Sequence, residues 1–157
     1  MIKNDPKMLY MACPTCKKKM VEEAGGYSIN SWNCEKCDFT TTNPVPTYIL
    51  TVKFWDASGS LWVKAYSENA IQLMGNMKPE EFKEKMDLSE EVREQEIRDI
   101  LQTQSFRKFS LMIKPTRNDY NNSQSINYFA QRVYDFSFKK NNNFLIQKLK
   151  AYQKASG

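Results

Sequence analysis

The sequence predicts a mainly β protein, a five-stranded barrel with a metal-binding finger inserted near its start. Three observations lead to this prediction. Two Cys-x-x-Cys pairs stand early in the chain, four later segments are rich in β-forming residues, and helical segments separate the first two of these strands from the last two. With 157 residues and 41% hydrophobic content, the chain can bury one core and is short for two ordinary domains. We therefore expect one domain over residues 1–157.

The early cysteine pairs are Cys13 with Cys16 and Cys34 with Cys37. Thiolates at this spacing form knuckles, and two knuckles make the four-sulfur tetrahedron that zinc prefers. Four sulfurs leave no coordination place for water or substrate, so the predicted Zn²⁺ is structural. The alternative is a pair of disulfides, which we disfavour because no signal peptide is visible and a chain of this length does not need them. The predicted zinc ribbon, residues 13–37, should be disordered without its metal.

The first strands lie on both sides of this ribbon. Leu9–Ala12, with Ile2 before it, is the only β-forming stretch ahead of the first cysteine. After the ribbon, Thr47–Phe54 and Leu61–Tyr66 flank the turn-forming residues Asp56 to Ser60. These two segments predict a β-hairpin.

A helical excursion over residues 67–103 follows the hairpin. Ser67 is positioned to cap a short helix that ends before Gly75. Pro79 suits the first turn of a second helix, and Ser89 is positioned to cap a longer third one. The excursion therefore separates the third strand of the barrel from the fourth.

The remaining strands are predicted at Phe106–Lys114 and Ile126–Phe136, joined by a polar loop over residues 116–122. Residues 138–155 are helical again. This order of elements matches a small Greek-key barrel with a helix at one end, which is the plan of the OB-fold. Because little sequence precedes the first strand, we expect the chain to be a fragment of a larger protein with several OB domains.

Alternation along the hairpin separates an inner set of side chains from an outer set. The inner set is apolar and consists of Leu50, Val52, Phe54, Leu61, Val63 and Ala65. The outer set interleaves rings with lysines and consists of Thr51, Lys53, Trp55, Trp62, Lys64 and Tyr66. Such a face suits single-stranded nucleic acid, because bases stack on rings while ammonium groups follow the phosphates. Alternatively, these rings pack against the helices of residues 67–103 or against a neighbouring domain.

The polar loop between the last two strands adds one aromatic and two cations to this hypothesis. Tyr120 is placed to meet the outer set across the barrel, and Lys114 and Arg117 border the loop, where they are positioned to contact the phosphate backbone. Each of the two cations, taken singly, is also typical of a solvated surface charge.

Charge is unevenly spread along the chain. The net charge is +5, yet residues 80–99 hold nine acidic against four basic side chains, so the rest of the chain carries +10. This asymmetry favours a polyanionic partner, although a positive surface also aids solubility. An enzyme is disfavoured because the chain has no histidine, no phosphate-binding glycine loop and no open metal site. No apolar run is long enough to cross a bilayer, so we expect no membrane association and an intracellular location.

Several segments carry a family resemblance. They read YMACPTCKKKM, NCEKCDF and LWVKAYSENAIQLMG, with Phe106-Arg107-Lys108-Phe109 and Tyr120-Asn121-Asn122 further along. From about Tyr10 to Phe138 the chain resembles the C-terminal DNA-binding domain of the large subunit of replication protein A. The resemblance implies an OB-fold with a zinc ribbon in its first hairpin, single-stranded DNA binding, no enzymatic activity and a nuclear location.

Carried over by residue, the resemblance implies base stacking by Trp62, Tyr66 and Tyr120, and zinc binding by the four cysteines. Trp55 is a departure, because relatives lack an aromatic there. The compact first Cys-x-x-Cys is another, since some relatives have extra residues between these cysteines. The family also has a telomerase-associated paralogue in ciliates, and the asparagine- and lysine-rich composition resembles proteins of such AT-rich genomes. Composition does not decide between general replication and a telomeric role within a telomerase holoenzyme.

The last helix supports a separate hypothesis. Leu145, Leu149 and Tyr152 recur at helical spacing, with Phe144 and Ile146 beside them. The resemblance implies that this helix joins two smaller OB-fold subunits in a three-helix bundle. The alternative is a helix folded back on its own barrel. The rival to DNA binding for the whole chain is a protein-assembly module whose OB face binds protein.

Overall fold

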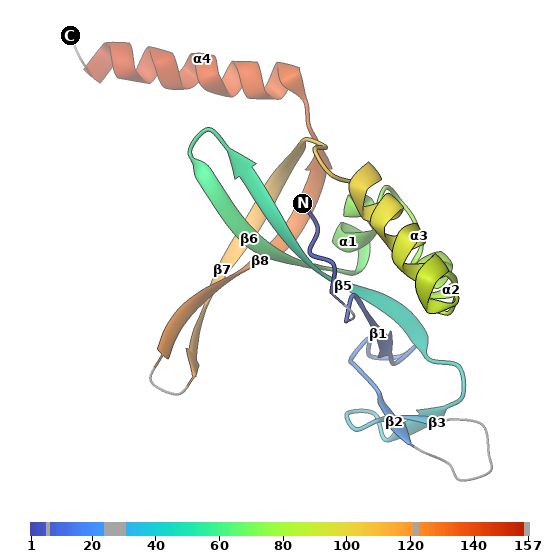
Figure 1. Cartoon of the computed structure of the whole chain (residues 1–157). Helices are drawn as coiled ribbons and strands as arrows, with labels where there is room; N and C mark the ends of the chain where they lie inside the picture. Colours follow the sequence, from blue (N-terminus) through green and yellow to red (C-terminus); the bar gives the residue numbers. More distant parts are fainter. Residues whose placement is uncertain (6, 24–30, 121–122, 156–157) are drawn as a thin grey trace.

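The computed structural model describes the whole chain except residues 6, 24–30, 121–122 and 156–157, and it leaves the side chains of 118–120 and 123–124 undescribed. The elements in chain order are β1 (Leu9–Ala12), β2 (Val21–Glu23), β3 (Ser31–Cys34), β4 (Phe39–Thr41), β5 (Val45–Asp56), β6 (Gly59–Tyr66), α1 (Ser67–Leu73), α2 (Pro79–Met86), α3 (Glu90–Thr103), β7 (Phe109–Tyr120), β8 (Ser123–Asp135) and α4 (Phe138–Ala155). Figure 1 shows a curved β-sheet body with the three helices α1–α3 on one side.

The body is a five-stranded sheet in the order β1-β5-β6-β8-β7. All its neighbours are antiparallel except β6 and β8, which pair in parallel at Lys64 and Phe129. The mainly β, OB-fold-like architecture is therefore confirmed. Within the described residues, β1 and β7 stand at the two ends of this order, so the sheet is open between them. One reason is that β1 has only four residues before Cys13 starts the ribbon.

The main core lies between the inner face of this sheet and helices α1–α3. The predicted alternation is confirmed here, because Leu50, Val52 and Ala65 are buried in it. The ring of Tyr48 lies 5.7 Å from that of Phe82 in α2, and its hydroxyl donates to the carbonyl of Lys78 at 3.3 Å. These contacts fix the helices to the inner face and leave the outer face of β5 and β6 open.

The helices lie where the sequence predicts them, but their capping differs. Ser67 is the first residue of α1 with φ +47°, and the extended Tyr66 takes the N-cap position. The reason is that β6 runs directly into α1, so the cap falls on the last strand residue. Pro79 begins α2 as predicted. Ser89 precedes α3 as its N-cap, yet its side chain makes no capping hydrogen bond.

The last two strands are longer than predicted. The sequence predicts a loop over the polar segment 116–122, whereas β7 continues through Tyr120 and pairs with β8 at Thr116↔Asn127 and Arg117↔Ile126. The exposed strands of a hairpin that extends past the core need no apolar face. Their polar sequence therefore lacks the apolar pattern from which a strand is predicted. Conversely, β7 begins at Phe109 and not at Phe106, which adopts a φ of +64°.

Asn69 of α1 fixes an irregularity in β8. The pairing steps from Met112↔Arg132 to Ile113↔Ala130 and skips Gln131. The Asn69 amide nitrogen donates to the carbonyls of Ala130 and Gln131 at 3.1 and 3.2 Å, while its oxygen accepts from the backbone N–H of Val133 at 3.0 Å. One side chain thus satisfies the backbone of the bulge and sets which face of β8 points outward.

The inserted segment forms a separate three-stranded sheet in the order β2-β3-β4. Its core is small and consists of the buried Cys13, Met20 and Cys34, with Cys16 and Trp32 packed against them. The insertion leaves the body after β1 and returns at β5.

Helix α4 extends away from the body (Figure 1). It is described over its full length, and no residue in it is buried. The alternative of a helix folded back on its own barrel is therefore wrong. No helix within the described part of the chain is both long and apolar enough to traverse a bilayer.

Candidate nucleic-acid interface and metal centre

The outer face of β5 and β6 carries the rings and lysines that the sequence places there. Trp62 is 44% exposed and lies directly across from Lys53, whose Nζ stands 5.9 Å from the centre of the indole. The alternative that these rings pack against the helices of residues 67–103 is not met at Trp62, because those helices cover the inner face. A flat ring beside an ammonium group is thus accessible from solvent.

A second part of the outer face is built around Phe129 of β8, which the sequence analysis missed. Its ring stacks on Tyr66 with centres 6.1 Å apart and planes 20° apart. Its neighbours across the two adjoining strand pairs are Lys64 and Lys114, and the Nζ of Lys64 lies 6.0 Å from the ring. Alternation along β8 holds the available signal, since inward Ala130 forces Phe129 outward.

Tyr10 of β1 extends this face beyond Tyr66. It pairs with Thr47, two residues before Ile49, which is the partner of Tyr66. Burial raises the pKa of Tyr10, and the charge of ionised Tyr66 raises it further; burial alone raises the pKa of Tyr66. Both phenols therefore stay neutral near pH 7 and offer uncharged rings to a polyanion.

The other predicted contact residues divide between the faces. Trp55 is 50% exposed and shares the outer face with Lys53, two residues away. Lys114 shares it through its pairing with Phe129. Arg117 stands three residues beyond Lys114 on the same strand, so alternation turns it to the opposite face. Tyr120 ends β7, and its side chain lies outside the described residues.

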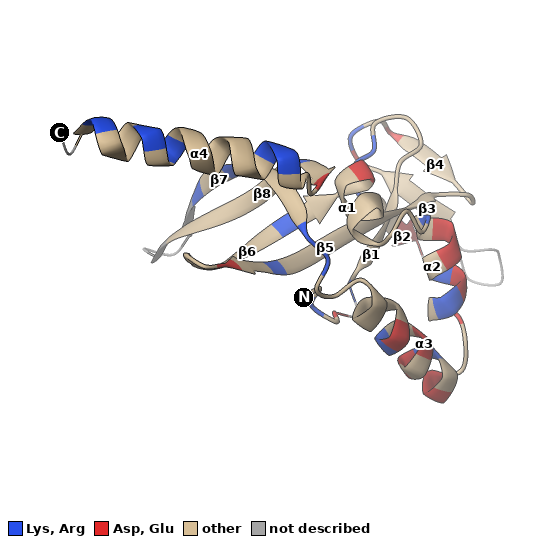
Figure 2. Ribbon diagram, turned by 90° about the horizontal axis from the view of Figure 1, so that it is seen from above, with Lys and Arg blue, Asp and Glu red and all other residues tan. Residues whose placement is uncertain are grey.

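The charge distribution separates the helices from this face. Figure 2 shows acidic residues gathered on α2 and α3 and basic residues along α4. The cations of the outer face include the lysines at positions 53, 64 and 114. A polyanion is therefore attracted to the outer face and repelled by α2 and α3.

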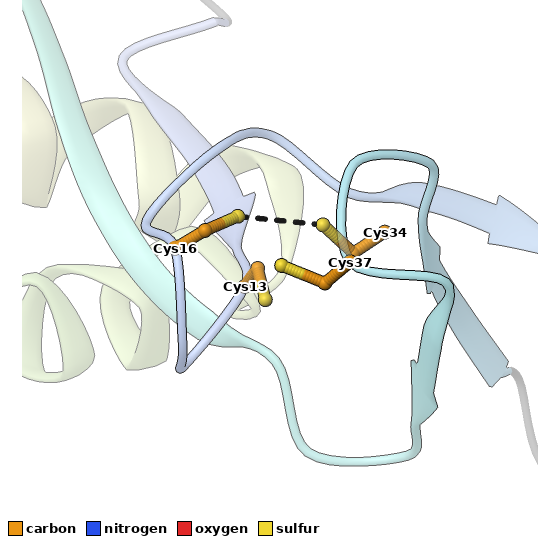
Figure 3. A group of neighbouring side chains, drawn as sticks. All are labelled: Cys13, Cys16, Cys34 and Cys37. Atoms are coloured by element: carbon orange, nitrogen blue, oxygen red, sulfur yellow. Dashed lines mark hydrogen bonds between the residues drawn. The ribbon is translucent and has the colours of Figure 1, made fainter.

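The four cysteines converge although they come from two separate turns. Their sulfurs all lie within 4.8 Å of one another, and Figure 3 shows the two knuckles facing each other. The Sγ atoms of Cys16 and Cys34 are 3.5 Å apart, and all four cysteines are free, so the alternative of two disulfides is not met. A tetrahedral zinc with Zn–S bonds of about 2.3 Å needs sulfurs roughly 3.8 Å apart. The cluster is thus of the right size for one metal ion.

Protonation of the cluster shows why a cation suits it. The backbone N–H of Cys16, the largest cause, lowers the pKa of Cys13 to about 6, and the backbone N–H of Lys18 lowers that of Cys16. Hydrogen bonding to Cys16 and burial raise the pKa of Cys37 to about 12. Without a cation, thiolates this close repel one another, so the sulfur of Cys37 keeps its proton. A divalent ion removes that repulsion.

The predicted partner-binding residues form an exposed apolar stripe on α4. Leu145, Leu149 and Tyr152 are 49%, 63% and 71% exposed, and Phe144 beside them is 55% exposed. Apolar side chains repeated along a helix that touches no core are typical of a surface that another helix covers.

Comparison with known proteins gives a consistent result. The family model described as "Replication factor-A C terminal domain" matches residues 1–145. Replication factor A protein 1 of Saccharomyces cerevisiae is 28% identical over 142 residues, which make up 89% of this chain and 21% of that protein. The mouse (Mus musculus) protein named "Replication protein A 70 kDa DNA-binding subunit" is 29% identical over 146 residues, or 90% of this chain and 22% of that protein. The chain thus spans less than a quarter of these relatives.

A solved structure resembles the fold as well. One chain of a replication protein A heterotrimer bound to single-stranded DNA superposes with a TM-score of 0.76 and 27% sequence identity. The match covers 96% of this chain and 33% of that one. These matches confirm the family resemblance that was inferred from the cysteine knuckles and the Leu61–Tyr66 strand.

Proposed function

Because this chain belongs to the family of replication factor-A C-terminal domains, we propose that it binds single-stranded DNA along the outer face of β5, β6 and β8. Trp62 and Tyr66 stack on bases, with Tyr120 as a third ring and Trp55 as a fourth. Lys53, Lys64 and Lys114 contact the phosphates. The chain acts by binding and not by catalysis, in keeping with relatives whose names describe them as DNA-binding.

The observation that carries this proposal is the exposed indole of Trp62 next to the ammonium group of Lys53. The indole of Trp62, 44% exposed, offers a flat apolar face to a ligand. A base covers it by stacking, which contributes about 1–3 kcal/mol per base, while the adjacent ammonium group meets the phosphate that follows. Because every base has a flat face, this arrangement binds without a strict sequence requirement.

Two substitutions test the proposal directly. Trp62→Ala and Tyr66→Ala should each weaken binding of a fluorescent single-stranded oligonucleotide by about 1–3 kcal/mol, with an unchanged circular dichroism spectrum. Val92→Ala on α3 is the control, because Val92 is exposed to a similar degree on the acidic side of the molecule. Loss of folding in place of affinity would contradict the proposal.

Salt dependence tests the role of the lysines. Log affinity should fall linearly with log salt, with a slope of about −0.7 per contacted phosphate. Lys114→Ala should reduce this slope by roughly one phosphate contact. Arg117→Ala should change it less, because Arg117 lies on the opposite face of β7.

The rival proposal is an assembly module whose outer face binds protein. It predicts that replacing Trp62 leaves DNA affinity unchanged. It also predicts that the lysines of the outer face contribute nothing to the slope of log DNA affinity against log salt. The same oligonucleotide titrations therefore separate the two functions.

We also propose that the cysteine cluster binds one structural Zn²⁺ through Cys13, Cys16, Cys34 and Cys37. The support is the donor set, four sulfurs within 4.8 Å of one another, two of them buried. The ion would cross-link the two knuckles, and its four sulfur ligands would leave no free coordination site for a reaction. Metal analysis of the purified chain should give one zinc per chain.

The stripe on α4 supports a further part of the proposal, assembly with two smaller OB-fold subunits. The similar solved chain comes from a heterotrimer. Sedimentation of the chain with candidate small subunits should show a complex that Leu145→Asp with Leu149→Asp abolishes. An unchanged complex would contradict this role.

A telomeric version of the function within a telomerase holoenzyme makes a different prediction. It requires a preference for guanine-rich repeats over a scrambled oligonucleotide of the same composition, whereas general replication requires none. Either version places the protein in the nucleus.

A further inference from the structure

Phe106 is the most exposed large apolar side chain among the described residues. Its exposed fraction is 83%, and it lies between α3 and β7 with a φ of +64°. A bulky residue in this left-handed region is strained, and such strain persists only where surrounding contacts impose it. The chain therefore holds an aromatic ring in water at a cost in stability.

The turn that presents Phe106 is firmly held on both sides. Ser105 donates through its hydroxyl to the carbonyl of Leu101 at 2.9 Å. Arg107 donates to the side chain of Gln104 at 2.7 Å. Gln104 in turn lies against Gly75, where an added Cβ would stand 2.7 Å from its side-chain oxygen. These contacts fix the backbone of Phe106 without covering its ring.

The one ring against Phe106 among the described contacts is Trp55, with centres 5.9 Å apart and planes at 84°. The two rings line a mostly apolar pocket of about 380 Å³, together with Met1, Lys53, Ser60 and Ser105. The residues of β5 and β6 in this lining, at positions 53, 55 and 60, all lie on the outer face. The pocket thus continues the candidate DNA path past Trp62.

We propose that the edge-to-face pair of Trp55 and Phe106 forms an additional base-binding subsite at the end of the outer face of β5. This inference rests on the proposed binding of single-stranded DNA. A base entering the pocket covers the exposed Phe106 ring and lies against the indole of Trp55. Lys53, which lines the pocket and stands over Trp62, is then shared by two consecutive nucleotides.

Charge supports a nucleotide as the occupant over an apolar peptide. Phe106 is followed by Arg107 and Lys108, and Lys53 forms one wall of the pocket. An open pocket with a cation at its wall suits a base attached to a phosphate. The subsite also gives a physical reason for the strained backbone, because relaxing φ would turn the ring away from Trp55.

The test measures affinity against oligonucleotide length. For the wild-type chain, affinity rises with each added nucleotide and levels off when the path is filled. Phe106→Ala should level off one nucleotide earlier, with roughly tenfold weaker binding at full length and unchanged binding of the shorter oligonucleotides. Replacing the terminal base by an abasic residue should cost the wild type the same factor and cost the variant nothing. Extensions at the 5′ and 3′ ends identify which end enters the pocket.

Two further variants separate the ring from the backbone. Phe106→Gly removes the ring and also tolerates the positive φ, so it should show the same loss as Phe106→Ala if the ring binds the base. Trp62→Ala should weaken oligonucleotides of every length, which reports on the proposed function itself. Equal affinities of wild type and Phe106→Ala at all lengths would overturn the subsite while leaving the proposed function intact. A uniform loss at all lengths would also overturn it, because Phe106 would then not act at the end of the path. Absence of any DNA binding would overturn both.

Discussion

The ribbon and the sheet body reach stability by different means. The body buries a continuous core of large apolar side chains, including Tyr48 and Phe82, under three helices. Among its described residues, the ribbon, with its three short strands, buries mainly Met20 and two cysteines, and Trp32 packs against them. Apolar burial of this extent does not offset the conformational entropy of ordering a segment of that length. We therefore expect the ribbon, unlike the body, to depend on the Zn²⁺ proposed for its two knuckles.

The two regions are also joined in a way that lets one fail without the other. The ribbon leaves the body after β1 and returns at β5, and these two strands pair directly at Ala12 and Val45. The pairing closes the insertion at its base. We therefore expect that unfolding of the ribbon does not spread past this residue pair into the body.

Removal of the proposed Zn²⁺ should have the largest effect, because it should unfold the ribbon and leave the body folded. Structural zinc contributes on the order of 10–16 kcal/mol of binding free energy in small zinc domains. Chelation, or Cys34→Ser, should abolish the ordered structure of β2–β4 while β5 and β6 stay folded. Hydrogen exchange followed by NMR measures both regions at once.

The result that would contradict this expectation is full protection of β3 after complete removal of metal. The matched control is Ser31→Ala in the same strand, which lies outside the sulfur cluster and should leave metal binding unchanged.

Truncation of Phe82 tests the stability of the sheet body. Its side chain is fully buried between α2 and β5, so Phe82→Ala should lower the free energy of unfolding of the body by about 3–5 kcal/mol. Below its lower melting temperature the variant should still bind one metal ion. Urea unfolding followed by fluorescence, with Val92→Ala as the exposed control, measures the difference. Simultaneous loss of metal and of the body under native conditions would show that the two regions form one cooperative unit.

Asn69→Ala should have an intermediate effect within the body. It leaves the carbonyls of Ala130 and Gln131 and the N–H of Val133 without their side-chain partner, which costs about 1–3 kcal/mol. Because the bulge sets which face of β8 points outward, DNA affinity should fall as well, through Phe129. Asn142→Ala on the exposed side of α4 is the matched control and should change neither quantity. Lower stability with unchanged DNA affinity would contradict the link between the bulge and Phe129.

Much of this arrangement can be predicted from local patterns in the sequence. Alternation sorts Trp62 from Val63 because one face of β6 meets the core, and spacing alone brings the cysteine knuckles together. The alternation and the two-residue spacing within each cysteine knuckle are both local features of the sequence. For this reason the sequence predicts the outer face of the first hairpin and the convergence of the four cysteines.

The features that sequence reasoning missed depend on distant partners. Ser67 does not cap α1 because β6 enters the helix without a linker. The extended hairpin of β7 and β8 has a polar sequence, so its strands lack the apolar signal. Phe129 and Phe106 gain their places only through pairing with Lys64 and contact with Trp55, which are far away in the chain.

The smallest expected effect concerns the turn between β5 and β6. A carboxylate stabilises this turn through hydrogen bonds, whereas thiols are the proposed metal ligands of the ribbon. Asp56 accepts hydrogen bonds from the hydroxyl and the backbone N–H of Ser58 at 2.6 and 2.8 Å. These bonds, the hydroxyl first, lower the pKa of Asp56 below its ordinary value of 3.8. A lowered carboxyl pKa stabilises the folded state above that ordinary value, and the contribution is lost as the pH falls through the folded pKa.

Asp56→Ala should therefore make the body slightly less stable at neutral pH and remove this part of its acid sensitivity. The ribbon should respond to acid earlier, because metal binding requires thiolates and protons compete for them as the pH falls. Urea unfolding of wild type and variant from pH 7 to pH 3, with metal release measured in parallel, compares the two regions. Ser58→Ala should reproduce the effect of Asp56→Ala, because it removes the hydroxyl that contributes most to the lowered pKa. If the body loses stability before the metal is released, the turn or another carboxylate of the body governs acid unfolding, and the ribbon is the more acid-resistant region.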